Sequence, residues 1–520
     1  MPIALGHDIS RARFLGAASV VVAAGCARHL ASTGLPIDQL RRLAGAVICA
    51  PVDVPSFDTG LAEELQAIAP GGYVLFGPTA SPEVFSSVSH QLRAIAAPRP
   101  AFIAVDQEGG AVQRIALTGR LPSPMALAAT RSTVLACAFG EHLGHLARLG
   151  GADTIFGPVL DLAAKTSPLG TRAFSDEVAL VAELGCAVAR GISSVGVRSV
   201  VKHFPGYSFA AGDPEQGEAI VRMPWPDVWK RSKQFSKVYP SAGHAVMTSH
   251  AIYSDLDPEN PGTLSPMLLG ILRSAMPNAM VISDALDMPA ITKHLTIGEA
   301  AVAAINAGVD CLLFSHLENT MQAVDGLIAA LRSGTISATR LEAAARRVRS
   351  FTERLMLAER VRPAKVLELT TEISSNSISA TNGATAIKSA HVAIVTFSNA
   401  SAHIAIALAN CLARSSTAIA VTVERWESAG HTRTPGRPDA TYRLALIDRR
   451  LPSWVISSCV QGLRGSRFAL VSLESPYDAA AFADSPTFFT YGEERAQIEA
   501  LVKILAEGQH VLGQLPVLLR

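Results

Sequence analysis

Eight short apolar runs alternate with longer amphipathic stretches between about residue 43 and residue 320 of this chain. The longer stretches repeat their apolar residues at helical spacing, and several end in glycine. Each run is continuously apolar, as in a parallel strand that is covered on both faces. Eight such units predict an α/β fold built on a (β/α)8 barrel. The runs are 45–51, 73–76, 101–106, 154–161, 199–204, 245–250, 280–284 and 311–315.

Titratable side chains follow five of these runs at or near the point where the strand should end. A flat, doubly wound sheet would show the same alternation, but polar residues at so many strand ends favour a closed barrel, whose catalytic groups lie there. Charge at a strand end suits a sugar or phosphate site better than a core. These residues are Asp106, Asp161, Lys202 with His203, His250 and Asp284.

The second part of the chain predicts a separate domain. A helical stretch at 335–357 ends the barrel, and a Ser/Thr/Asn-rich stretch at 370–385 is typical of a linker. Further apolar runs and helices follow. We therefore expect a catalytic barrel at 36–358, a linker at 359–388 and a smaller α/β sandwich domain at 389–520.

Composition excludes several classes of function. The 45 basic and 44 acidic residues give a net charge of +1, without a long charge run, so we expect no nucleic-acid partner. No interior segment has the roughly 18 uninterrupted apolar residues of a membrane span. Seven scattered cysteines, none in a CxxC pair, predict small buried side chains and not a disulfide framework or zinc site.

Residues 1–35 have the pattern of an export signal. Arg11 and Arg13 precede a short apolar segment that ends in Ala-Ala-Gly-Cys at Cys26. That ending resembles a lipoprotein processing site, and SRARFLG resembles a twin-arginine signal with Ala12 in the second arginine's place. An ordinary buried helix is the alternative. We expect an exported protein, either secreted or anchored in the envelope by a lipid on Cys26.

Asp284 is the strongest candidate for covalent chemistry. It ends the seventh run, where a carboxylate at a barrel mouth can attack an anomeric carbon and form a glycosyl-enzyme intermediate. The alternative is that Ser283 and Asp284 cap the helix that follows.

Three cationic or imidazole side chains are candidate sugar contacts. Lys202 and His203 supply several hydrogen-bond donors, although a lysine paired with a carboxylate beside a core histidine would give the same pattern. The Arg172 guanidinium suits sugar hydroxyls or a carboxylate, and its alternative is a surface ion pair with Asp176 or Glu177.

Two loops carry further acidic residues. Asp106 precedes Gly109 and Gly110, which permit close backbone approach, but neither a dinucleotide nor a phosphate-loop motif is present. The polar loop 206–218 carries Asp213 and Glu215. Carboxylates on a mobile loop above a barrel mouth can act as proton donors, and a solvated acidic loop is the alternative.

As a set, these segments resemble glycoside hydrolase family three and, within it, the bacterial β-N-acetylglucosaminidases that trim peptidoglycan fragments. The matching stretches are AVDQEGGAVQR, FGPVLD, GTRAF, VKHFPG, VMTSHAIYSDLDP, VISDALDM and AINAGVDCLLF. The resemblance implies retaining hydrolysis of a terminal β-linked N-acetylglucosamine-type sugar. It implies no cofactor and no metal.

The resemblance also implies roles for individual residues. Asp284 would be the nucleophile. The hydroxyls of the terminal sugar would be held by Asp106, Arg114, Arg172, Lys202 and His203, and His250 is a further candidate contact.

One departure from the family pattern concerns the proton donor. The β-N-acetylglucosaminidase branch has an Asp-Ser-His triplet after KHFPG, where this chain has Asp213, Pro214 and Glu215. Tyr207, Ser208 and Thr171 also differ from the usual residues. We hypothesise that Glu215 is the acid/base partner of Asp284, with carboxyl groups about 5–5.5 Å apart when the loop closes.

Because of this departure, two other functions stay open. One is a different β-glycosidase that acts on a secreted small-molecule glycoside. The other is a non-catalytic sugar-binding protein of the envelope.

Overall fold

The structure is a computed structural model. It describes residues 36–117, 119–242, 244–353, 366–381, 384, 387, 391–397, 399–415, 420–425, 442–447, 463, 467–482 and 485–519. The predicted export signal and Cys26 lie outside the described residues. Within them, no helix is long and apolar enough to cross a bilayer.

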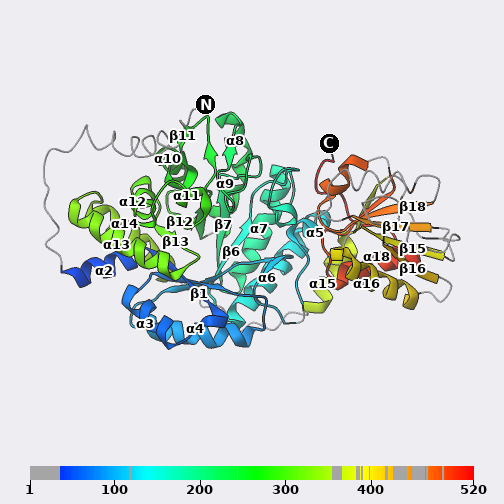
Figure 1. Cartoon of the computed structure of the whole chain (residues 1–520), viewed down its shortest axis with the longest axis horizontal. Helices are drawn as coiled ribbons and strands as arrows, with labels where there is room; N and C mark the ends of the chain where they lie inside the picture. The colour runs from blue at the N-terminus through cyan, green and yellow to red at the C-terminus, as the bar shows by residue number, and fades with distance from the viewer. Residues whose placement is uncertain are drawn as a thin grey trace, which may run out of the picture.

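Eight parallel strands close into a barrel, with β13 hydrogen-bonded to both β12 and β1 (Figure 1). Each strand coincides with one of the eight predicted runs, so the (β/α)8 prediction is confirmed. The strands are β1 (Ile48–Asp53), β2 (Gly72–Phe76), β3 (Phe102–Val105), β6 (Thr154–Val159), β7 (Arg198–Phe204), β9 (Ala245–Thr248), β12 (Met280–Ala285) and β13 (Cys311–Leu313).

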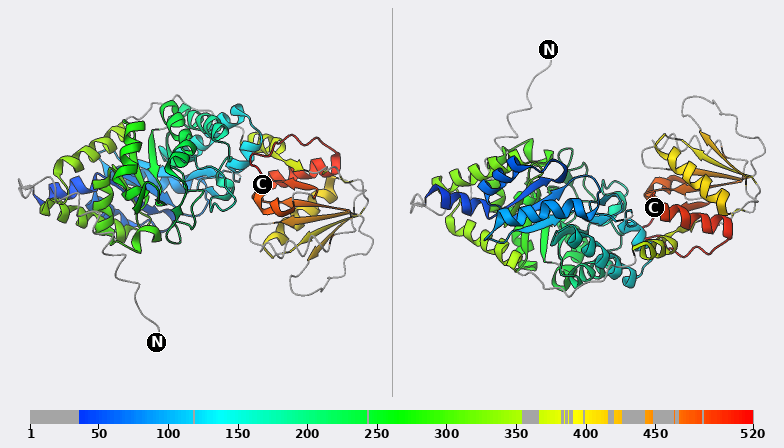
Figure 2. Two further views of the ribbon diagram at one scale, coloured as in Figure 1. Left: turned by 90° about the horizontal axis from the view of Figure 1, so that it is seen from above. Right: turned by 90° about the horizontal axis from the view of Figure 1, so that it is seen from below.

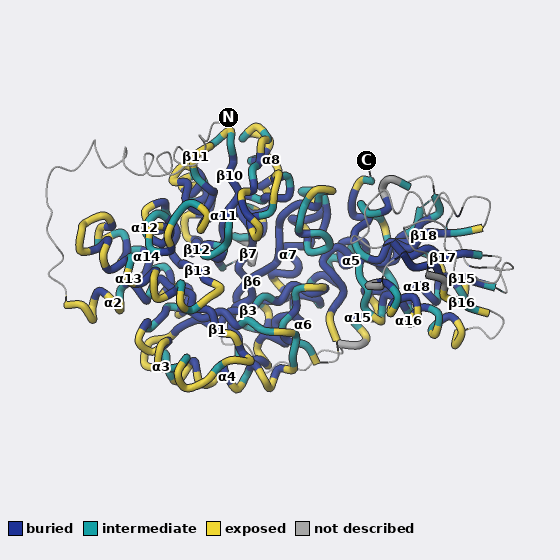
Figure 3. The backbone as a smooth tube through the Cα atoms, viewed as in Figure 1, coloured by how far each residue is buried: buried dark blue, intermediate teal, exposed yellow. Residues whose placement is uncertain are grey.

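The barrel strands are continuously apolar because they are buried on both faces, as Figure 3 shows. Their inward side chains fill the barrel, among them Phe102, Phe156 and Met247. The helices pack on the outside. They are α2 (Ile37–Gly45), α3 (Thr59–Ile68), α4 (Pro82–Ala96), α5 (Pro124–Ala129), α6 (Thr133–Leu149), α7 (Val178–Ser194), α8 (Trp225–Arg231), α9 (Lys233–Ala242), α10 (Pro266–Ala275), α11 (Pro289–Thr292), α12 (Ile297–Ala307), α13 (Leu317–Ser333) and α14 (Ala338–Glu353).

Short strands decorate the loops at the carboxyl ends of the barrel strands. A two-stranded hairpin follows β3, and a three-stranded sheet forms from the loops after β7 and β9. They are β4 (Gln107–Gly109) with β5 (Val112–Gln113), and β8 (Ile220–Val221) with β10 (Ile252–Tyr253) and β11 (Asp257–Pro261).

The second domain is a six-stranded sheet in the order β14-β19-β18-β17-β15-β16, with helices packed against it. All its pairings are parallel except that of β14 with β19. Its elements are α15 (Val366–Ser377), β14 (Ser379–Thr381), β15 (His391–Thr396), α16 (Asn399–Ser415), β16 (Ala420–Arg425), β17 (Tyr442–Ile447), β18 (Phe468–Ser472), β19 (Thr487–Phe489) and α18 (Arg495–Glu507).

The predicted linker differs from the structure, because α15 and β14 lie within 359–388. Ile373 and Ile378 are fully buried there. The serine-rich composition hid this order, since the hydroxyls of Ser377 and Ser379 donate to carbonyls inside the segment. The segment therefore packs on both domains, with Ile373 in the core of the barrel and Ile378 in that of the second domain, and is not a plain connection.

Candidate active site

The carboxyl ends of β3, β7 and β12 bring the predicted polar residues together at one end of the barrel. Lys202, at the end of β7, has its Nζ 2.7 Å from Asp106 Oδ1 and 2.7 Å from Glu108 Oε1. Its side chain is only 3% exposed. The two carboxylates raise the pKa of Lys202 even though burial alone would lower it, so the side chain stays a cation.

Arg172 meets the same carboxylate from the other side. Its Nε and Nη2 donate to the two Glu108 oxygens at 2.8 and 3.0 Å, a bidentate geometry that fixes the guanidinium plane. Burial raises the pKa of Glu108, but Arg172 and Lys202 outweigh burial and lower it to about 2. Glu108 is therefore the ionised centre that joins the two cations.

Asp284 lies on strand β12, and the described helices after it begin at residues 289 and 297. The predicted alternative of a helix cap is therefore wrong. Its Oδ1 accepts the neighbouring Ala285 N–H at 2.9 Å, and its side chain is 17% exposed. Burial raises the pKa of Asp284, but His203, His250, Lys202 and this hydrogen bond have the larger, opposite effect. The net pKa is below the usual value, so the carboxylate is ionised at neutral pH.

His203 is held in place by a buried carboxylate. Asp161 Oδ2 lies 2.8 Å from His203 Nδ1 and accepts the His203 backbone N–H at 2.8 Å, while Oδ1 accepts the Tyr207 N–H at 2.9 Å. Because a carboxylate faces Nδ1, that nitrogen carries a proton. The other ring nitrogen, Nε2, lies 3.9 Å from Asp284 Oδ2.

Two predicted sugar contacts, His250 and Arg114, bond to protein atoms outside the cluster of Lys202, Glu108 and Arg172. His250 uses both ring nitrogens on protein atoms, at 2.8 Å from Thr263 Oγ1 and 2.9 Å from the Ala285 carbonyl, which favours a role in positioning β12 over direct contact with substrate. Arg114 donates to the Gly77 carbonyl at 3.1 Å and makes no ion pair with any described residue. It remains a predicted contact.

The loop 206–218 packs against the segment that follows Asp284. The Pro214 carbonyl accepts the Ala290 N–H at 3.2 Å, and Lys293 Nζ donates to the Gln216 carbonyl at 3.1 Å. Asp213 Oδ1 accepts the Glu215 N–H at 3.0 Å, which closes a local turn. The Glu215 side chain is exposed, and among the described residues it has no ion pair.

Tyr207, at the start of this loop, packs against His203. It is buried, and its ring packs edge-on against His203 with centroids 5.3 Å apart. Burial and the nearby carboxylates of Asp161, Asp284 and Asp213 raise the pKa of Tyr207, so its hydroxyl stays protonated and can only exchange hydrogen bonds with a substrate.

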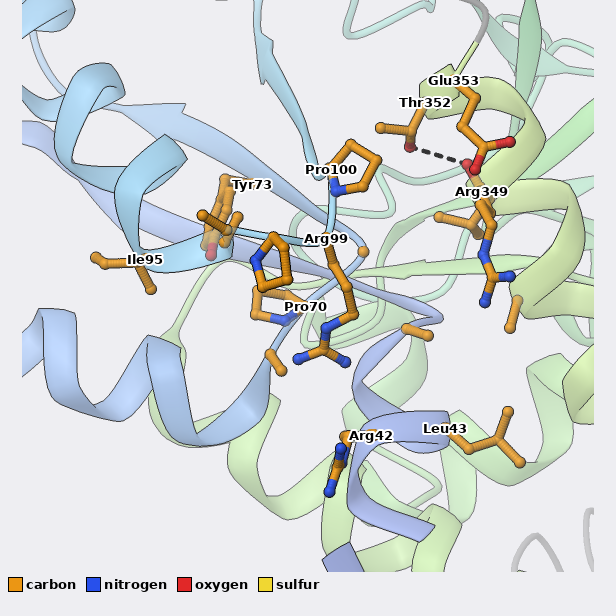
Figure 4. A pocket seen from close by; sticks show the side chains of 18 of the residues that line it. Arg42, Leu43, Pro70, Tyr73, Ile95, Arg99, Pro100, Arg349, Thr352 and Glu353 are labelled. Carbon is orange, nitrogen blue, oxygen red and sulfur yellow. Dashed lines mark hydrogen bonds between the residues drawn. The ribbon is translucent and has the colours of Figure 1, made fainter. Parts of the chain in front are cut away.

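A cavity of about 640 Å³ lies at the opposite end of the barrel, beside the amino ends of β1 to β3 (Figure 4). Three arginines and the Tyr73 ring line it: Arg42, Arg99 and Arg349. Glycosidic chemistry needs paired carboxyl groups, and this lining contains a single one, Glu353. The candidate active site is therefore the cluster around Asp284 and not this cavity.

Comparison with known proteins agrees with this assignment. The sequence model described as "Glycosyl hydrolase family 3 N terminal domain" matches residues 46–351, which is more than half of the chain. The chain belongs to glycosyl hydrolase family 3. It is a glycosidase similar to the β-hexosaminidases, two of which show the relationship at the level of sequence.

The β-hexosaminidase of Nitrosomonas eutropha is 34% identical over 274 residues, which cover 50% of this chain and 77% of that protein. The β-hexosaminidase of Stenotrophomonas maltophilia is 33% identical over 275 residues, covering 50% and 82%. A solved family 3 β-N-acetylglucosaminidase from Paenibacillus sp. str. FPU-7 has a TM-score of 0.80 at 24% identity, covering 94% of this chain and 99% of that chain. At that identity it shows a shared fold across both domains.

In this family 3 glycosidase, sequence reasoning did not single out Glu108, and it named Asp161 as a strand-end residue without a role. Glu108, and not Asp176 or Glu177, is the partner of Arg172, and Asp161 orients His203. A signal existed for each. Glu108 is two residues beyond Asp106 and beside Gly109, and Asp161 ends one of the eight apolar runs.

Proposed function

We propose that this family 3 glycosidase is a retaining β-N-acetylhexosaminidase that forms a covalent glycosyl intermediate on Asp284. The observation that supports this best is the ionised Asp284 carboxylate at the end of β12. It is partly exposed to solvent and lies 3.9 Å from His203, which Asp161 orients. A retaining enzyme needs such a nucleophile, held ionised beside hydrogen-bond donors.

The charged cluster suits binding of a terminal pyranose. Lys202 uses two of its three donors on Asp106 and Glu108, and Arg172 uses two of its five on Glu108. The remaining donors, with the second oxygen of Asp106, can hold adjacent sugar hydroxyls. Fixed donors of this kind bind the sugar without reorganising at the moment of reaction.

In the first chemical step, Asp284 attacks C1 while the C1–O bond breaks and the departing oxygen takes a proton. We assign that proton to Glu215, which has to move toward the sugar with its loop. In the second step, Glu215 takes a proton from water, whose oxygen attacks C1 and releases Asp284. The product keeps the β configuration.

We further propose peptidoglycan fragments as the substrate and the cell envelope as the location. The support is the family resemblance and the signal-like segment that ends at Cys26. Fractionation of cells that produce the full chain tests the location. A Cys26→Ser variant should leave the membrane fraction, and identical membrane association of both proteins would contradict lipid anchoring.

A substrate panel tests the activity. Purified protein should hydrolyse 4-nitrophenyl N-acetyl-β-glucosaminide in preference to the corresponding glucoside and glucosaminide, and proton NMR should show the β anomer first. Preference for the glucoside would favour the alternative of a different β-glycosidase. Sugar binding without turnover of any substrate would favour a non-catalytic sugar-binding protein, and initial release of the α anomer would overturn the retaining mechanism.

A further inference from the structure

The chain after α18 returns to the barrel, and its end lies between the two domains in both views of Figure 2. We name residues 509–519 the C-terminal strap. The Gly513 N–H donates to the Ile378 carbonyl at 3.1 Å, which fixes the strap to the second domain. The Gln514 N–H donates to the Ala129 carbonyl at 2.9 Å, which fixes it to α5 beside the barrel.

The strap contacts the loop that carries Arg172. The Ser175 hydroxyl donates to the Pro516 carbonyl, and Asp176 Oδ2 accepts the Leu518 N–H at 3.0 Å. Ser175 is fully buried, and its carbonyl accepts the Ala163 N–H at 2.8 Å, so this point of the loop cannot shift freely.

Apolar packing joins the same surfaces. Val517 of the strap is buried in one cluster with Met125 and Ala129 of α5 and with Ala173, the residue next to Arg172. Phe489 and Tyr491 of the second domain belong to this cluster too. Interdigitated buried side chains transmit displacement, because protein interiors are close-packed.

The other partner of the ion pair is supported from the second domain as well. The Ser123 hydroxyl donates to the Tyr491 carbonyl at 2.7 Å. A Cβ at Gly110 would lie 2.9 Å from Ser123 Cβ, so the hairpin that carries Glu108 rests directly on Ser123. The second domain therefore supports both loops whose side chains form the Arg172–Glu108 pair.

We propose that the C-terminal strap and Tyr491 position the Arg172–Glu108 pair, so that the second domain sets the affinity of the barrel for its sugar. The strap residues are positioning residues, since their contacts reach the substrate only through Arg172. This inference rests on the proposed function, in which Arg172 binds the terminal sugar. Bidentate pairs depend on geometry, and a displacement of the guanidinium weakens every contact that it makes.

Leu518→Pro tests the strap, because it removes the N–H that Asp176 accepts, while Leu518→Ala keeps that N–H at an exposed position. With 4-nitrophenyl N-acetyl-β-glucosaminide, we expect Leu518→Pro to raise KM about tenfold with kcat within about twofold, the cost of weakening one charge-assisted hydrogen bond. Leu518→Ala should match the wild type. An unchanged KM in Leu518→Pro would overturn the proposal.

Asp176 provides a second test from the barrel side. Asp176→Ala should raise KM, and Asp176→Asn should restore it because the amide keeps an acceptor oxygen. In an Arg172→Ala background, Asp176→Ala should add no further loss. An equal increase in KM from Asp176→Ala with and without Arg172 would show a merely structural role and contradict the proposal.

Hydrogen–deuterium exchange of the substrate-free protein separates this inference from the proposed function. Leu518→Pro should speed exchange in peptides covering 170–176, whereas Leu518→Ala should not. Unchanged exchange would overturn the positioning role of the strap, even if the enzyme hydrolyses its substrate. Faster exchange in a protein that hydrolyses none of the panel would leave the positioning role standing and reject the proposed function.

Discussion

The two sides of the barrel mouth are held in different ways. On one side Lys202, Glu108 and Arg172 form a buried chain of contacts of 2.7 to 3.0 Å. On the other side the loop 206–218 presents an exposed Glu215 and packs on the segment after Asp284 mainly through backbone carbonyls. The groups proposed to hold the sugar are placed by folding, and the proposed proton donor is not.

This difference separates binding from chemistry. Contacts on the paired side are made before substrate arrives, so they act on affinity. Glu215 has to be brought to the glycosidic oxygen, so it acts on the rate of the steps that move a proton. The four variants below test the proposed nucleophile and the two sides of the mouth, from the largest expected effect to the smallest.

Asp284→Asn removes the proposed nucleophile, which belongs neither to the charged cluster nor to the loop 206–218. We expect kcat for 4-nitrophenyl N-acetyl-β-glucosaminide to fall about 10⁴-fold or more, because the covalent route is closed. Sugar binding by calorimetry should persist, since Lys202 and Arg172 are untouched. A variant that keeps a tenth of the wild-type rate would break the assignment.

Glu108→Gln tests the paired side. At pH 7 it should lower the free energy of unfolding by about 3–5 kcal/mol, because the buried Lys202 and the partly exposed Arg172 lose their shared, buried carboxylate. The pKa of Glu108 is lowered to about 2, so its stabilisation is present above about pH 4.5 and is lost as the pH falls toward 2. Denaturant titrations should therefore show the difference from wild type shrinking over that range.

The exposed Glu177 supplies the control for this measurement. Glu177→Gln should change stability by less than about 1 kcal/mol at any pH in this range, because its ion pair with Arg131 lies at the surface. A difference between Glu108→Gln and wild type that stays constant from pH 7 to pH 3 would contradict the proposed charge network.

Glu215→Gln tests the open side. With a poor leaving group we expect kcat/KM to fall about 10²-fold, while an activated aryl leaving group, which needs no proton, is nearly unaffected at this step. With the activated aryl substrate, added azide should restore turnover of the glycosyl intermediate, because azide replaces the base-activated water in the second step. The neighbouring Glu218→Gln is the matched control, and equal rates for both variants would show that Glu215 is not the acid/base group.

His203→Gln should have the smallest effect of the four variants, a shift in the pH dependence of kcat/KM. The His203 imidazole lowers the pKa of Asp284, so its loss should raise that pKa. Activity falls when Asp284 is protonated, and the acid limb of kcat/KM should therefore move to higher pH. A limb that stays in place or moves to lower pH would show that another group controls it.

The barrel and the strand-end residues were predictable because the relevant signals are local. Eight continuous apolar runs specify buried parallel strands, and closure then brings Asp106, Lys202, His203 and Asp284 to one end. Asp106 and Lys202, two of these residues, pair with each other, but partners outside this set were not predictable. Glu108 reaches Arg172 across 64 positions of sequence through loops whose conformations depend on packing.

The second domain shows the same limit. The strands β15 to β18 are apolar runs and were predicted, whereas α15 and β14 were hidden by a polar composition. The strap carries no motif at all. Its contacts with Ser175 and Asp176 use the Pro516 carbonyl and the Leu518 N–H, which residue identity does not report.

Trapping of the intermediate tests the central claim most directly. The protein is incubated with 5-fluoro-N-acetylglucosaminyl fluoride, digested and examined by peptide mass spectrometry. The account predicts one sugar per chain, attached to the peptide that contains Asp284. An adduct on another residue, or steady hydrolysis of the reagent without any adduct, would contradict it.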